Sequence, residues 1–180
     1  MSATTKGNEM KLEIYKLIKV LEQLSKGEIP VPLDCCWSGS KVISLLDSVK
    51  RQYPIGSLTF SNRNLGSERE IIDGRCRIRA LFDAFCCDKH LVYNAEDDVF
   101  EYLKSENTSV FHFPVNKTLD TIGFLAQSEM IKKSKDSRVK KWIENIEDFI
   151  KVVFDYKISV ITVKNLSVEE VEELMCRLNR

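Results

Sequence analysis

Apolar residues recur along this chain with two spacings, which predict helices in some segments and strands in others. Spacings of three and four residues place side chains on one face of a helix and predict helices over residues 10–27, 38–53, 74–85, 118–133, 139–153 and 167–178. Short β-branched or alternating runs predict strands over residues 55–60, 70–72, 91–93, 99–102, 111–113 and 157–163. Pro30 and Pro32 exclude a helix over residues 28–33, which we expect to be an extended edge segment.

This order of elements predicts a single α+β domain of residues 10–180, preceded by a disordered start at residues 1–9. Two helices have sharply defined apolar faces, namely Val42, Leu45, Leu46 and Val49 in one and Val139, Trp142, Ile143, Ile146, Phe149, Ile150 and Val153 in the other. We expect Leu119, Ile122, Leu125 and Ala126 to share one face of the helix over residues 118–133. His112, between two aromatic residues on a strand, is expected to face solvent.

Composition narrows the classes of function only slightly. The 180 residues contain 27 basic and 27 acidic side chains, so the overall charge attracts neither nucleic acid nor anionic lipid. No C-x-x-C pair is present, and the usual zinc spacings are absent. Reduced thiols, no secretory signal and no apolar run of membrane length favour a cytoplasmic protein.

A basic run, Lys132, Lys133, Lys135, Arg138, Lys140 and Lys141, is the one local departure from this balance. Six positive charges in ten residues can contact a DNA backbone. A solvated linker between two helices explains the same residues, and the balanced overall charge favours it. DNA therefore stays a candidate partner through the Lys132–Lys141 region.

The most informative stretch runs from Ile71 to Phe82, where a β-branched pair meets Asp73-Gly74 and turns directly into a helical pattern. The first turn of a helix carries unpaired N–H groups and the positive end of its dipole, and both favour an anion. Arg75, Arg77 and Arg79 crowd those turns. The best functional prediction from these residues is a phosphate or nucleotide site, but a structural Asp73 cap, with Gly74 relieving a tight turn and the arginines on a solvated helix face, is the commoner cause of such a pattern.

Short motifs in a fixed order resemble the N-terminal domain of GmrSD-type restriction systems. The family's Ile-Pro and Trp positions match Ile29-Pro30 and Trp37, its Leu-Leu pair matches Leu45-Leu46, and Tyr53-Pro54-Ile55-Gly56 follows as in the family. Its Asp-Gly-Gln-Gln-Arg signature corresponds to residues 73–77, and its Phe-x-Arg-Ile-Asn motif to residues 175–179. The similarity extends over about residues 10–179.

This resemblance implies a ParB/sulfiredoxin-like fold and a nucleotide-binding, NTP-hydrolysing domain in prokaryotic defence against phage. It implies that Gly74, Arg75, Cys76 and Arg77, with Arg177 and Asn179, bind a nucleoside triphosphate. Asp73 and Arg77 would be the catalytic residues, with Asp73 also holding Mg²⁺. The expected partners are a nucleotide and a nuclease subunit or another protein, and we do not expect this chain to cut DNA alone.

Departures from the family pattern leave the mechanism open. Arg75 and Cys76 replace both signature glutamines, and Val31-Pro32-Leu33-Asp34 stands near the missing Tyr-Gln-Arg triplet. The first hypothesis is a nucleotide-binding domain with weak NTP hydrolysis, which requires outward-facing guanidinium groups in an open hollow. The alternative is a non-catalytic regulatory module that binds a protein or DNA. Cys76 at a helix N-terminus among arginines also predicts a lowered thiol pKa, and thus thiol reactivity.

Overall fold

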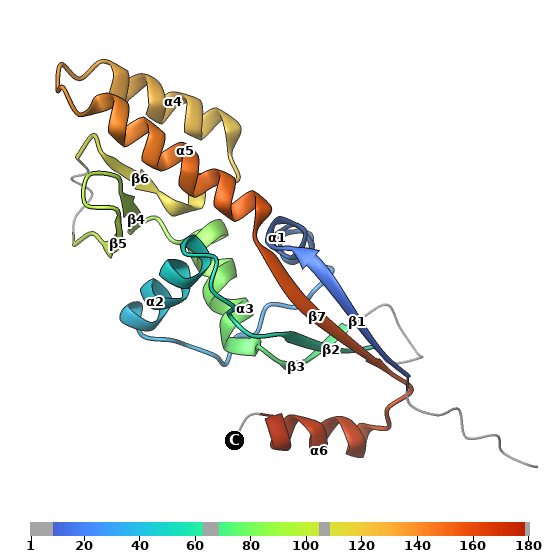
Figure 1. The fold of residues 1–180 in the computed structure, drawn as a ribbon. Coiled ribbons are helices and arrows are strands. Elements are labelled where there is room, and N and C mark those ends of the chain that lie inside the picture. The colour runs from blue at the N-terminus through green and yellow to red at the C-terminus, as the bar shows by residue number, and fades with distance from the viewer. Residues whose placement is uncertain (1–8, 63–68, 105–108, 179–180) are drawn as a thin grey trace, which may run out of the picture.

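Two small β-sheets and the helices around them form the described part of the chain, residues 9–62, 69–104 and 109–178 of a computed structural model (Figure 1). The strands are β1 (Glu9–Lys16), β2 (Leu58–Asn62), β3 (Arg69–Asp73), β4 (Leu91–Asn94), β5 (Val99–Tyr102), β6 (His112–Pro114) and β7 (Lys157–Lys164). The helices are α1 (Leu17–Ser25), α2 (Gly39–Lys50), α3 (Arg75–Phe82), α4 (Thr121–Lys132), α5 (Val139–Asp155) and α6 (Val168–Leu178). The predicted α+β class is confirmed.

The larger sheet has the strand order β1-β7-β2-β3. β7 is antiparallel to β1 and parallel to β2, while β2 and β3 are antiparallel. In the β2–β3 register Asp73 lies opposite Thr59. The end of β3 therefore lies beside the segment that leads into β2, and this pairing builds the strand-to-helix corner.

The smaller sheet is antiparallel, with β4 between β5 and β6, and it lies beside α4 and α5 (Figure 1). Tyr93 and Phe100 of this sheet pack on Phe149 of α5, with ring centroids 5.0–5.4 Å apart. The predicted hairpin over residues 91–102 is confirmed. Helix α6 contacts β3 of the larger sheet, away from α4 and α5 (Figure 1).

The two helices whose spacing is clearest in the sequence each bury four residues in the hydrophobic core. Helix α2 buries Val42, Leu45, Leu46 and Val49, as predicted. Helix α5 buries Trp142, Ile146, Phe149 and Val153. Val171 is the buried residue of α6, whose capping box is formed because Ser167 and Glu170 exchange backbone-to-side-chain hydrogen bonds of 2.7 and 3.2 Å.

The prediction of a helix over residues 10–27 is wrong for its first half. Residues 9–16 form β1, and the helix begins at Leu17. Met10, Leu12 and Ile14 are two residues apart, which is the repeat of a strand, and β1 is fixed by its antiparallel ladder with β7. Residues 28–33 are extended or turn-like but join no sheet among the described residues.

The apolar residues expected to share one face of α4 do not form its buried face. Ile122 is 81% exposed and Leu125 57% exposed, whereas Ile131 and Ser128 are buried. The helix begins at Thr121 rather than Thr118, and it packs on α5 through the face that carries Ile131. Its apolar residues lie on several faces, so spacing alone does not select the buried one.

His112 does not face solvent as predicted. Its side chain is buried, its Nδ1 accepts a hydrogen bond from the Ser109 N–H at 3.1 Å, and its Nε2 lies 3.2 Å from Glu101. The predicted strand over residues 55–60 is β2, displaced to residues 58–62. The polar residues 61–67 are expected from the sequence to form a turn between two strands, but Ser61 and Asn62 belong to β2, and residues 63–67 lie outside the described residues.

Candidate functional site

The corner between β3 and α3 is built around Gly74, as the Asp-Gly pair predicts. Gly74 has a φ of 88°, a backbone conformation that glycine adopts without strain. The Asp73 carboxylate accepts a hydrogen bond from the Gly74 N–H at 2.7 Å and so closes the turn. A Cβ at position 74 would lie 2.5 Å from the Leu58 side chain, so this side of the corner is filled.

Arg77 is held inside the corner by two partners. One Nη donates to the Asp73 carboxylate at 3.0 Å, and the other donates to the backbone carbonyl of Ile55 at 2.6 Å. Only 17% of the side chain is exposed. The guanidinium also lies against Gly56, where a Cβ would come within 2.1 Å of Nη1. Arg77 therefore joins α3 to both the end of β3 and the segment that enters β2.

Arg75 and Arg79 attach the segment around Asp34 to α3. Arg75 donates to both carboxylate oxygens of Asp34, at 2.7 and 2.9 Å. Arg79 donates to Asp83 at 2.6 Å and to the Pro32 carbonyl at 3.2 Å. The hydrogen bond from Arg75 also lowers the pKa of the Asp34 carboxyl group.

The expectation of an open hollow lined by free guanidinium groups is therefore wrong. All three arginines after Gly74 have carboxylate partners within the chain, and Leu58 fills the space beside the glycine. The physical reason is that Asp34 and the Ile55 carbonyl, far away in sequence, approach the helix once the sheet has formed. Spacing within residues 73–79 carries no information about these partners.

The predicted lowering of the Cys76 pKa is wrong as well. Burial, together with the neighbouring Cys35 thiol, raises the pKa of this thiol to about 11. Desolvation of the thiolate outweighs the helix N-terminus, and the nearby arginines are already paired with carboxylates. At neutral pH Cys76 is a protonated thiol, which removes the chemical basis for redox reactivity at this position.

The residues present do not form a metal site by themselves. No group of three or more histidine, cysteine or carboxylate side chains suited to a metal occurs in the part of the chain that the structure describes. Both oxygens of Asp73 already accept hydrogen bonds, from Gly74 and Arg77. An Mg²⁺ ion at Asp73 would have to displace the Arg77 contact.

Arg177, the other predicted nucleotide ligand, lies near the end of α6 and pairs with Glu173 one turn earlier. Within residues 9–62, 69–104 and 109–178, no hydrogen bond or ion pair joins Arg177 to residues 73–77. Its side chain lines a cavity of about 180 Å³ with Leu166 and Leu174. Asn179 lies outside the described residues.

A cavity of about 170 Å³ lies beside the corner, at the N-terminal ends of the parallel strands β2 and β7. It is lined by Ile55, Gly56 and Ser57 on one side and by Tyr156 and Ile158 on the other. The Tyr156 hydroxyl donates to the Tyr53 carbonyl at 2.6 Å. Ile55, whose carbonyl accepts the hydrogen bond from Arg77, thus also lines this cavity, whereas Arg77 does not.

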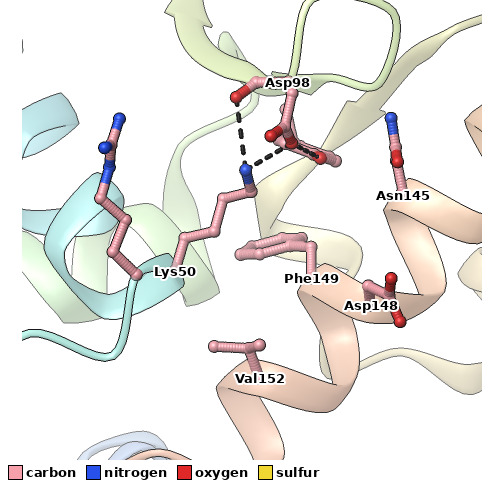
Figure 2. Close-up of a pocket in the computed structure, with 8 residues that line it drawn as sticks. Lys50, Asp98, Asn145, Asp148, Phe149 and Val152 are labelled. Carbon is pink, nitrogen blue, oxygen red and sulfur yellow. Dashed lines mark hydrogen bonds and ion pairs between the residues drawn. The ribbon is translucent and has the colours of Figure 1, made fainter.

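A third cavity, of about 220 Å³, lies between α2, α5 and the β4–β5 turn (Figure 2). Lys50 points from α2 to Asp98 and pairs with it, while Asp148 and Phe149 line the α5 side. Burial and the hydrogen bond to Asp98 keep the pKa of Tyr93 far above its ordinary value. No residue of the 73–77 corner lines this cavity, and sequence reasoning did not find it because its residues come from distant segments.

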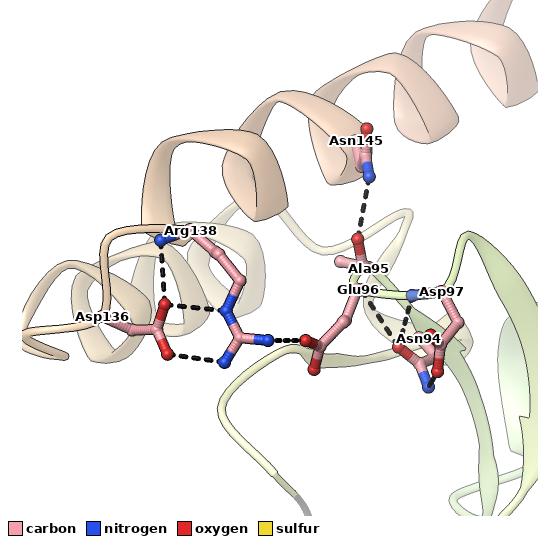
Figure 3. Close-up of polar contacts among 7 residues, drawn as sticks. All are labelled: Asn94, Ala95, Glu96, Asp97, Asp136, Arg138 and Asn145. Carbon is pink, nitrogen blue, oxygen red and sulfur yellow. Dashed lines mark hydrogen bonds and ion pairs between the residues drawn. The ribbon is translucent and has the colours of Figure 1, made fainter.

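The predicted basic region is partly neutralised. Arg138 pairs with Asp136, at 2.7 Å, and with Glu96 across the gap to the β4–β5 turn, while Asn145 donates to the Ala95 carbonyl at 2.8 Å (Figure 3). Lys132 and Lys140 also have acidic partners on their own helices. Arg138 therefore stabilises the start of α5 against the small sheet. Three of the six basic side chains have acidic partners, which weakens the interpretation of this region as a DNA contact.

Residues 34–180 match the family described as GmrSD restriction endonuclease, N-terminal domain. Because this match covers well over half of the chain, the protein belongs to that family, as the resemblance predicted. The family associates the chain with restriction systems and thus with defence against phage. No curated protein matches the chain. Among the described helices, none combines the length and the apolar character needed to cross a bilayer.

Proposed function

We propose that this protein is a non-catalytic module of a restriction system, which binds a protein partner and regulates it without turning over a nucleotide. One observation carries the proposal. Both Nη atoms of Arg77, the arginine at the signature position, donate hydrogen bonds within the chain, one to the Asp73 carboxylate and one to the Ile55 carbonyl. An arginine used in this way maintains the fold. The loss of both signature glutamines, to Arg75 and Cys76, agrees with this use.

A protein partner is favoured over DNA by the surface of the chain. The net charge is zero, and three of the six residues in the basic region have acidic partners. By contrast, α4 presents Ile122, Leu125 and Met130 to solvent, each more than half exposed. Ile122 and Leu125 are three residues apart and so lie side by side on one face of the helix, and adjacent exposed apolar side chains are typical of protein contacts. The nuclease component of the same restriction system is the partner we propose.

Nucleotide binding at residues 73–77 is the second candidate function, with a ParB/sulfiredoxin-like fold as its expected framework. The backbone N–H groups of the first turn of α3 support it, since they can contact a phosphate if Arg75 and Arg77 leave their carboxylates. Two ion pairs and the contact with Ile55 would have to break first. This requirement makes it the weaker candidate.

A phosphate-release assay distinguishes the non-catalytic module from an NTPase. The chain is incubated with each of the four common NTPs and Mg²⁺, alone and with the nuclease component and DNA. We expect the wild type to release phosphate at the same rate as Asp73→Ala. Copurification with the nuclease, weakened by Ile122→Lys but not by Asp73→Asn, is the positive result. Turnover that Asp73→Asn abolishes while the variant stays folded would overturn the proposal in favour of an NTPase.

A further inference from the structure

Strand β1 forms an edge of the larger sheet and carries an exposed apolar row. β7 pairs with one side of β1, and no described strand pairs with the other. Met10, Leu12 and Ile14 alternate along the strand, so they share one face, and they are 73%, 63% and 59% exposed. A long edge strand with such a row is a ready template for a further strand.

The opposite face of β1 carries charges of alternating sign. Lys11 and Glu13 are two residues apart, on the same face, and their side chains form an exposed ion pair of 3.0 Å within the strand. Because the two charges flank Leu12 symmetrically, reversing the strand about Leu12 places each charge opposite its counterpart. The strand is therefore complementary to its own reverse.

We propose that β1 pairs antiparallel with β1 of a second copy of this chain, about a two-fold axis at Leu12. In this register Lys11 lies opposite Glu13 of the other copy, Met10 lies opposite Ile14, and Leu12 lies opposite itself. Opposite residues in an antiparallel pair lie on the same face and interact directly. The two exposed apolar rows thus become one continuous row.

Neighbouring registers are excluded by charge. An axis at Lys11 places Glu9 opposite Glu13, and an axis at Glu13 places that glutamate opposite itself. Like charges directly opposite each other destabilise a strand pair. An axis midway between two residues would put side chains of opposite faces together, which the pleat forbids.

The pairing joins two four-stranded sheets edge to edge and satisfies the open backbone groups of both β1 strands. It gives an isologous interface, in which the same surface is used by both copies. β1 precedes the residues matched by the family and is separate in sequence from the 73–77 corner. This inference therefore stands or fails independently of the proposed function.

The test is the mass of the whole chain by sedimentation equilibrium, together with charge reversals on β1. The wild type is expected at twice 20.8 kDa. Lys11→Glu or Glu13→Lys alone places two like-charged pairs across the axis, and each raises the dissociation constant at least about tenfold. The double variant Lys11→Glu/Glu13→Lys restores both pairs and the dimer. Mixing the two single variants gives a heterodimer, although neither forms a homodimer.

Two controls distinguish the loss of β1 pairing from misfolding and from contacts elsewhere on the surface. Lys11 is exposed and Glu13 is partly exposed, so thermal unfolding should show that each variant folds like the wild type. Ile122→Lys changes an exposed apolar residue on α4, outside β1, and should leave the dimer intact. A wild type that stays monomeric up to about 1 mM, a dimer unchanged by Lys11→Glu, or a dimer lost only in Ile122→Lys would each overturn pairing through β1.

Discussion

Arg77 occupies the space that a side chain at Gly56 would need, because a Cβ at position 56 would lie 2.1 Å from Nη1 of the arginine. Gly56 also has a φ of +84°. The guanidinium therefore fits between a glycine in the left-handed region and the Asp73 carboxylate. This close packing is what we expect of a residue that holds two segments together, and it underlies the interpretation of the corner as structural.

Gly56→Ala should lower the free energy of unfolding by about 2–3 kcal/mol, from backbone strain together with the clash against Arg77. Gly27→Ala is the matched control, since Gly27 also has a positive φ, of +72°, but nothing lies within 4 Å of its Cβ position. That control should cost about 1 kcal/mol. Urea unfolding of the two variants measures the difference, and equal losses would contradict the packing.

Arg77→Ala should destabilise the fold by about 2–4 kcal/mol. The change leaves the Asp73 carboxylate with one donor fewer and the Ile55 carbonyl without its partner. Arg177→Ala removes an exposed ion pair of the same i,i+4 type and should change the stability by less than about 0.5 kcal/mol. Denaturant midpoints compare the two variants. A fully stable Arg77→Ala protein would show that the arginine is kept for another purpose.

Cys76 should react slowly with alkylating reagents at neutral pH. Its pKa of about 11 lies above the ordinary value of 9.0, so the thiolate fraction should grow about tenfold for each pH unit between 7 and 10. Mass spectrometry of the peptide that contains Cys76 follows the modification, with Cys76→Ser as the control. A rate that reaches a plateau below pH 8 would mean a lowered pKa and restore a reactive cysteine.

The two faces of α4 should respond oppositely to truncation. Ile131→Ala empties a fully buried position and should cost about 2–4 kcal/mol. Ile122→Ala removes an exposed side chain and should change the stability by less than about 0.5 kcal/mol. Thermal unfolding distinguishes them. A large loss for Ile122→Ala in the isolated chain would mean that this residue is buried in solution.

The parts of the fold that sequence reasoning predicted are those determined by local physics. The four-residue stripe of α2 and the turn at Gly74 both depend on neighbours within a few positions. β1 was missed because Met10, Leu12 and Ile14 run into the helical spacing of α1. Only the ladder with β7, more than a hundred residues away, distinguishes a strand from a helix there.

The location of the corner was predictable, and its interior was not. The Asp73-Gly74 pair after two isoleucines placed the strand-to-helix turn correctly. The partners of the arginines, Asp34 and the Ile55 carbonyl, are set by sheet pairing and by the path of the chain around α3. Asp34 ends the stretch Val31-Pro32-Leu33-Asp34, which lies near the place where the resemblance led us to expect a Tyr-Gln-Arg triplet, and that departure was a signal that this segment has a different use.

The central claim, that Arg77 maintains the fold and the corner does not receive a nucleotide, is tested most directly by calorimetric titration of the wild-type chain with each NTP in the presence of Mg²⁺. The account predicts no saturable heat up to about 1 mM nucleotide. Saturable binding to the wild type that is lost in folded Asp73→Asn protein would contradict it.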